Sequence, residues 1–137
     1  MSSPTDPGRL LRWSLRGNAT FSTLSGATLM GAGASLATTF GVPEPMMLTS
    51  LGVNLLAFAA FLVWLASREE IRPALALAVV GADLAWVVGS VPVLLFAALT
   101  PAGNWSVAVV GNVVLAFAIA QFVGVRQLRP RATVSPS

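Results

Sequence analysis

Asp83 is the residue of this 137-residue chain whose type and position most clearly suggest chemistry. It lies within a long apolar stretch, ten positions beyond Pro73. At about 1.5 Å per helical residue this is about 15 Å deep, close to the middle of a bilayer. A charge there costs at least about 2.5–3.5 kcal/mol, so the carboxyl group must face the protein interior, find hydrogen-bond donors or take up a proton. The alternatives are a proton, ion or ligand site and a structural contact that fixes helix register, and we favour the second because no other acid or base lies in an apolar stretch.

The depth of Asp83 also predicts its neighbours. Polar residues at a similar depth on the other apolar stretches should form one layer across the helices, since polar side chains in a membrane face the protein interior. The predicted members of this buried polar layer are Asp83, Asn54, Ser25, Thr28 and Asn112.

The composition excludes most other site chemistry. The chain contains no Cys, His or Tyr, and all eight of its basic residues are arginine. Without Cys and His, few ligands remain for haem, zinc or copper, and the usual nucleophile–base pairs of hydrolases cannot be built. We therefore expect no cofactor, no metal site and no enzymatic activity.

Four apolar stretches must position these residues. The chain is 55% hydrophobic and only 9% charged, with a mean hydropathy of +0.80, whereas soluble domains carry about 25% charged residues. A membrane-spanning helix needs roughly 20 mostly apolar residues. We therefore predict an all-α polytopic membrane protein, an antiparallel bundle of four transmembrane helices within residues 17–126. The expected helices cover residues 17–40, 46–66, 73–99 and 105–125.

An alternative concerns the first of these helices. Basic residues, a modest apolar stretch and the small residues Ala32-Gly33-Ala34 also resemble a cleaved signal peptide. The abundance of Ser, Thr and Gly in the stretch argues against this interpretation.

The arginines predict the orientation in the membrane. They are Arg9, Arg12 and Arg16 before the first stretch, Arg68 and Arg72 between the second and third, and Arg126, Arg129 and Arg131 after the fourth. With four spans they all fall on one side, so the positive-inside rule places both termini in the cytoplasm of an inner (plasma) membrane. We expect residues 1–16 to form a basic amphipathic segment on the cytoplasmic surface and residues 127–137 a disordered tail. These arginines predict a lipid bilayer as partner and no nucleic acid.

The two halves of the chain look alike. Residues 52–59 read Gly-Val-Asn-Leu-Leu-Ala-Phe-Ala, and residues 111–118 read Gly-Asn-Val-Val-Leu-Ala-Phe-Ala. The same comparison equates Asn18 with Asp83, Phe21 with Trp86 and Ser25 with Ser90. This pattern is typical of two duplicated helical hairpins in a parallel repeat. The alternative is that apolar segments of low complexity align by chance.

Small residues at every fourth position indicate faces on which membrane helices pack closely. Such faces bury contacts inside a bundle or dock on another subunit. The candidate packing faces are Ala27, Gly31 and Ser35 in the first helix and Gly81, Ala85 and Gly89 in the third.

Three short motifs carry a resemblance. At residues 18–26 (Asn-Ala-Thr-Phe-Ser-Thr-Leu-Ser-Gly), at residues 82–87 (Ala-Asp-Leu-Ala-Trp-Val) and at Thr100-Pro101 the chain resembles a group of uncharacterised bacterial four-helix inner-membrane proteins. The likeness spans about residues 16–126. It implies the four-helix fold and no activity, and in that group the position of Asp83 can be Asn.

These observations favour a non-catalytic accessory or scaffold subunit of a larger membrane assembly, formed with other membrane proteins or with further copies of the chain. Short loops, the absence of a catalytic set and the small-residue faces all point this way. The alternative is a small homo-oligomeric channel or transporter that uses Asp83 in the membrane.

Overall fold

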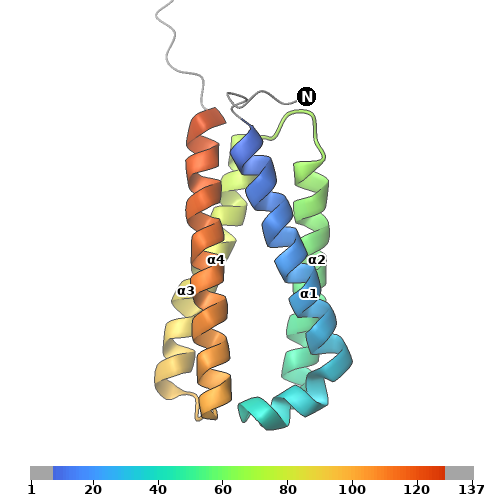
Figure 1. Ribbon diagram of the computed structural model, residues 1–137, viewed down its shortest axis with the longest axis vertical. Coiled ribbons are helices and arrows are strands. Elements are labelled where there is room, and N and C mark those ends of the chain that lie inside the picture. Colours follow the sequence, from blue (N-terminus) through green and yellow to red (C-terminus); the bar gives the residue numbers. More distant parts are fainter. Residues whose placement is uncertain (1–7, 129–137) are drawn as a thin grey trace, which may run out of the picture.

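The computed structural model describes residues 8–128 and folds them into four antiparallel α-helices (Figure 1). They are α1 (Arg9–Phe40), α2 (Pro45–Ala66), α3 (Pro73–Phe96) and α4 (Pro101–Leu128). The predicted all-helical architecture is confirmed. Three of the helices, α2, α3 and α4, are long and apolar enough to cross a membrane.

Helix α1 begins earlier than the apolar pattern predicts, at Arg9 instead of residue 17. The segment expected on the membrane surface therefore supplies the first turns of α1. Leu11 and Leu15 are fully buried there, because their side chains pack into the core with residues of α2. Arg12 donates to the main-chain oxygens of Ala66 (2.7 Å) and Glu69 (2.6 Å). It thus satisfies carbonyl groups at and just beyond the C-terminus of α2 that no helical partner can reach.

The last two helices also differ from the prediction. Helix α3 ends at Phe96 instead of residue 99, and α4 begins at Pro101 instead of residue 105. Residues 100–104 contain Pro and Gly, which favour a turn, but Pro is also well tolerated at the first position of a helix. The hydroxyl of Thr100 accepts a hydrogen bond from the amide of Gly103 (3.2 Å), so Thr100 caps this helix. Helix α4 continues to Leu128, and the rest of the predicted tail, with Arg129 and Arg131, lies outside the described residues, as do residues 1–7.

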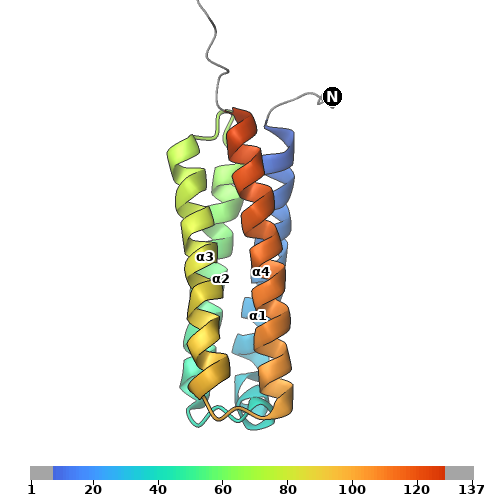
Figure 2. The ribbon, with the colours of Figure 1, turned by 90° about the vertical axis from the view of Figure 1, so that its left-hand side faces the viewer.

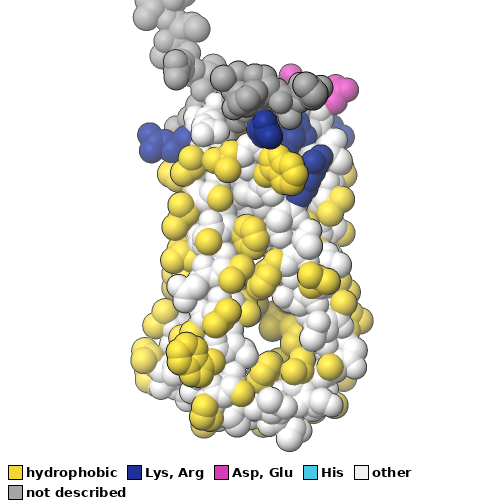
Figure 3. Space-filling view, in the orientation of Figure 1, with side chains coloured by type: hydrophobic (Ala, Val, Ile, Leu, Met, Phe, Trp, Pro, Cys, Tyr) yellow, Lys and Arg dark blue, Asp and Glu magenta, His cyan; other side chains and the backbone are white. Residues whose placement is uncertain are grey.

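The helices pack as two hairpins. Helix α1 lies along α2, α3 lies along α4, and the two hairpins meet mainly through α1 and α4 (Figure 2). Although they are consecutive in sequence, α2 and α3 are not closely packed against each other. The main apolar core lies at the end of the bundle where the arginines gather (Figure 3).

Glycines set the closest helix contacts. A Cβ atom at Gly26 of α1 would lie 2.8 Å from the carbonyl oxygen of Gly52 in α2, and a Cβ atom at Gly52 would lie 2.8 Å from that of Gly26. Between α1 and α4, a Cβ atom at Gly124 would lie 2.9 Å from the backbone of Leu11. These approaches require residues without a side chain.

The far end of the bundle is closed by a bend in α1. Ala32 has non-helical backbone angles (φ −122°, ψ 20°), and the segment after it runs across the end of the bundle (Figure 1). There Thr100 donates through its hydroxyl to the carbonyl oxygen of Thr39 (2.6 Å) and through its amide to that of Phe40 (3.0 Å). Between this closure and the core the surface is hollowed (Figure 3).

Burial follows the predicted repeat. Asn18 and Asp83 occupy equivalent positions, are both buried and form a hydrogen bond to each other. The agreement is incomplete, since Ala19 is buried and its equivalent Leu84 is exposed. It also ends towards the other end of the bundle, where Gly26 and Ala37 are buried but their equivalents Val91 and Ala102 are exposed. The other equivalent pairs that are buried in both halves are Leu11 with Ala76, Ser14 with Val79, Leu15 with Val80, Ala59 with Ala118, Leu62 with Gln121, Leu65 with Gly124 and Ala66 with Val125.

Candidate functional site

Asp83 lies in the interior of the bundle, where it is only 2% exposed. The side-chain amide of Asn18 in α1 donates to its Oδ2 atom at 2.9 Å. The hydroxyl of Ser22, one turn further along α1, donates to the Oδ1 atom of Asn18 at 3.3 Å. This chain of bonds ties α3 to α1 through polar groups that are all shielded from the surroundings.

Gln121 brings α4 to the same place. Its side chain is fully buried and lies beside the carboxyl group of Asp83. Within the described part of the chain, neither its Nε2 nor its Oε1 atom completes a hydrogen bond of good geometry. We call Asp83, Asn18, Ser22 and Gln121 the buried polar cluster, and it connects three of the four helices.

Of the predicted polar layer, Asp83 is buried as expected, but the other four residues do not surround it. Asn54, Asn112 and Thr28 are exposed, and each donates to a main-chain carbonyl one turn earlier in its own helix, at 3.0, 2.8 and 2.7 Å. Ser25 is half-buried, and among residues 8–128 it does not bond to Asp83. Depth alone does not fix the side of a helix on which a residue lies, so matching depths selected residues that point away from Asp83.

Sequence reasoning missed Asn18 because the first helix was expected to begin at residue 17. From Arg9, Asn18 lies about 14 Å along the helix, close to the depth of Asp83. The repeat had already equated the two residues, which was the available signal. Gln121 lies beyond the second repeat motif, and its place in the interior follows only from the packing of α4.

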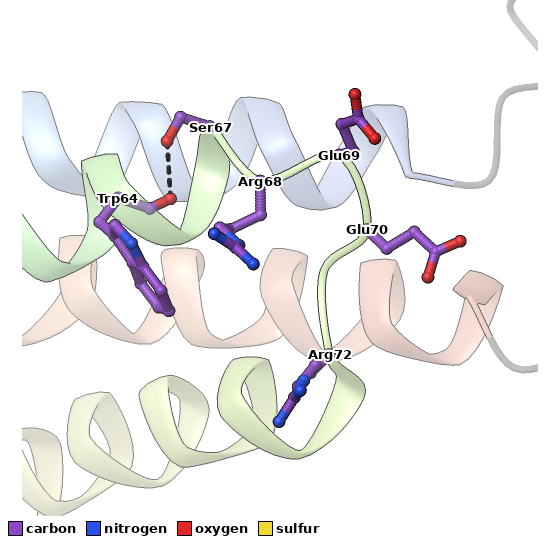
Figure 4. A pocket seen from close by; sticks show the side chains of 6 residues that line it. All are labelled: Trp64, Ser67, Arg68, Glu69, Glu70 and Arg72. Atoms are coloured by element: carbon purple, nitrogen blue, oxygen red, sulfur yellow. Dashed lines mark hydrogen bonds between the residues drawn. The ribbon is translucent and has the colours of Figure 1, made fainter.

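Asp83 lines neither of two pockets on the surface of residues 8–128. One, of about 610 Å³, lies at the arginine-rich end and is lined by Trp64, Ser67, Arg68, Glu69, Glu70 and Arg72 (Figure 4). The other, of about 550 Å³, lies beside the first half of α2 and is lined by Glu44, Met46, Met47, Ser50, Leu51 and Asn54. Enclosed by helices and bonded to Asn18, the carboxyl group of Asp83 is placed to hold α1 and α3 in register.

The candidate packing faces lie on the outside of the bundle. Ala27, Gly31 and Ser35 are exposed, and the contact of α1 with α2 instead uses Gly26 and Gly33. The face of α3 that carries Gly81, Ala85 and Gly89 is exposed as well. A Cβ atom placed on Gly31, Gly81 or Gly89 would meet nothing within 4 Å.

The comparisons with known proteins add no further constraint. No protein-family model, curated protein or solved structure matches this chain.

Proposed function

We propose that all four helices cross the membrane, with the arginine-rich end and both termini in the cytoplasm. Helix α1 has the most polar sequence of the four, but several of its polar side chains are buried or bonded within the helix. Asn18 and Ser22 face the protein interior. The exposed hydroxyls of Thr20, Thr28 and Thr39 donate to carbonyl groups of α1 itself, so they can face lipid without an unsatisfied donor.

Cysteine labelling tests this topology directly. The chain has no cysteine, so Glu44→Cys and Glu70→Cys provide single reporters in the loops at opposite ends of the bundle. In intact spheroplasts an impermeant maleimide should label Glu44→Cys but not Glu70→Cys. After permeabilisation it should also label Glu70→Cys, and only then should a tag on the N-terminus become accessible. A tag accessible from the same side as Glu44→Cys would show that α1 does not cross.

We propose further that the protein is a non-catalytic accessory or scaffold subunit of a larger membrane assembly. The observation that carries this proposal is the contrast between two groups of glycines. Gly26, Gly52 and Gly124 lie at close helix contacts that need them. Gly81 and Gly89 lie on an exposed face of α3 where none of residues 8–128 requires a small residue. In membranes such faces let a second helix approach closely, and its contacts then provide the association energy.

Enlarging this face should abolish the assembly without harming the fold. In Gly81→Leu/Gly89→Leu the new side chains meet no atom of this chain near the backbone, but they would hold a docked helix away. Native mass spectrometry of tagged protein, gently extracted from its own membranes, should show a stoichiometric complex for the wild type and an isolated chain for the double variant. Ala116→Leu, on an exposed part of α4, should retain the complex. A wild-type protein that always isolates alone contradicts the proposal.

The alternative function, a homo-oligomeric channel or transporter that uses Asp83, has less support. The carboxyl group is bonded to Asn18 and lines neither surface pocket. A transport site needs access from at least one side of the membrane, whereas a register contact needs none.

A further inference from the structure

The predicted repeat makes the contact between α1 and α4 equivalent to a contact between α3 and α2. In the structure the two differ in how closely the helices approach. Helix α1 approaches α4 closely where Gly17 accommodates Phe117 and Gly124 accommodates Leu11. The repeat places Ala82 at the position of Gly17 and Leu65 at that of Gly124. The second contact region, between α3 and α2, therefore lacks both glycines, and these helices remain apart.

The 610 Å³ pocket opens where this α2–α3 gap meets the arginine-rich end. Trp64, Arg68 and Arg72 extend into it from the end of α2 and the start of α3, whereas the side chains of Glu69 and Glu70 point away from them (Figure 4). The guanidinium of Arg68 lies over the indole of Trp64, 5.3 Å from the ring centroid. This contact holds one cation beside the gap while leaving its outer donors available.

The start of α3 adds a favourable potential. Arg72 precedes Pro73, the first residue of the helix, and the first turn contains no acidic residue and no side-chain cap. The amino end of a helix carries a partial positive charge. The guanidinium groups of Arg68 and Arg72 line the pocket, and Arg72 directly precedes this helix end, so the local potential favours an anion.

We propose that this pocket binds the phosphate headgroup of an anionic phospholipid, whose acyl chains lie against the exposed apolar surface of the bundle below it. Arg68 and Arg72 would hold the phosphate oxygens through charge-assisted hydrogen bonds, and Trp64 lies at the depth of the headgroups, where tryptophan is enriched. In the membrane placement proposed above, this pocket lies at the level of the lipid headgroups, and Val63 and Trp64 beside it are exposed, which suits a lipid better than a soluble ligand. The proposal rests on the membrane placement proposed above, but not on the assembly.

Native mass spectrometry in a neutral detergent can test it, with defined lipids added to the purified full chain. Phosphatidylglycerol should bind as one retained copy, and phosphatidylcholine with the same acyl chains should bind at least about tenfold more weakly. Arg68→Gln/Arg72→Gln should weaken phosphatidylglycerol binding by about tenfold or more, since two charged donors are lost.

The matched control is Arg16→Gln/Arg126→Gln. It removes the same charge at the same end, including an arginine that lies over Phe122 much as Arg68 lies over Trp64 (6.0 and 5.3 Å). This control should bind the lipid as the wild type does. Equal losses in the two double variants, equal binding of the two lipids, or displacement by millimolar inorganic phosphate would each overturn the proposal. If the wild-type protein binds phosphatidylglycerol as expected but always isolates without partner proteins, only the proposed scaffold function is overturned.

Discussion

Replacing Asn18 by leucine should destabilise the bundle by about 1–3 kcal/mol, because it leaves the buried carboxyl group of Asp83 without its donor. Individual hydrogen bonds between membrane helices are worth only about 0.6–2 kcal/mol. The larger cost arises because Asp83 cannot turn to water when its partner is removed. The measurement is thermal or denaturant unfolding of the purified protein in detergent.

The double variant Asn18→Leu/Asp83→Leu should recover part of this loss. With both partners apolar, the buried carboxyl group that lacked its donor is itself removed, and the two effects should fail to add by about 0.5–3 kcal/mol. Asp83→Asn should remain close to the wild type, because its amide oxygen can still accept from Asn18.

Asn54→Leu and Asn112→Leu provide matched controls. Both asparagines are exposed and bonded only to their own helix, so their replacement should change the stability by no more than about 0.5 kcal/mol. If all three asparagine variants behave alike, or if the Asn18 and Asp83 effects simply add, the cluster does not hold the helices in register.

The number, order and approximate limits of the helices could be predicted because apolar length and turn residues are local signals. The wrong start predicted for α1 shows that these local signals do not identify every core residue. Leu11 and Leu15 stand among arginines, so hydropathy alone classed them as surface residues. Only the packing of α1 on α2 and α4 shows that they belong to the core.

The helix faces could not be predicted for a related reason. Helix α1 is so rich in small residues that it contains two overlapping patterns. Ala27, Gly31 and Ser35 keep a regular four-residue spacing, yet the pattern that meets α2 includes Gly26 and Gly33. The choice between them depends on where α2 places its own glycine, which is information from another helix.

Placing a methyl group at Gly52 should destabilise the α1–α2 hairpin by about 1–3 kcal/mol, even though alanine is the better helix former. The new Cβ atom would lie 2.8 Å from the carbonyl oxygen of Gly26 and 2.9 Å from the side chain of Met30. Met30 can adjust, but the carbonyl oxygen is part of the α1 backbone and can move only with the helix. The same unfolding measurement in detergent detects the loss.

The repeat supplies the control for this prediction. Gly111 of α4 occupies the position equivalent to Gly52, but a Cβ atom there meets the side chain of Ser90 at an ordinary 3.8 Å. Gly111→Ala should therefore stabilise the protein by about 0.4–1 kcal/mol through the loss of backbone freedom in the unfolded chain. Opposite signs at equivalent positions would show that the two hairpins, alike in sequence, are held together at different distances. A neutral or stabilising effect of Gly52→Ala would contradict the close approach of Gly26 to Gly52.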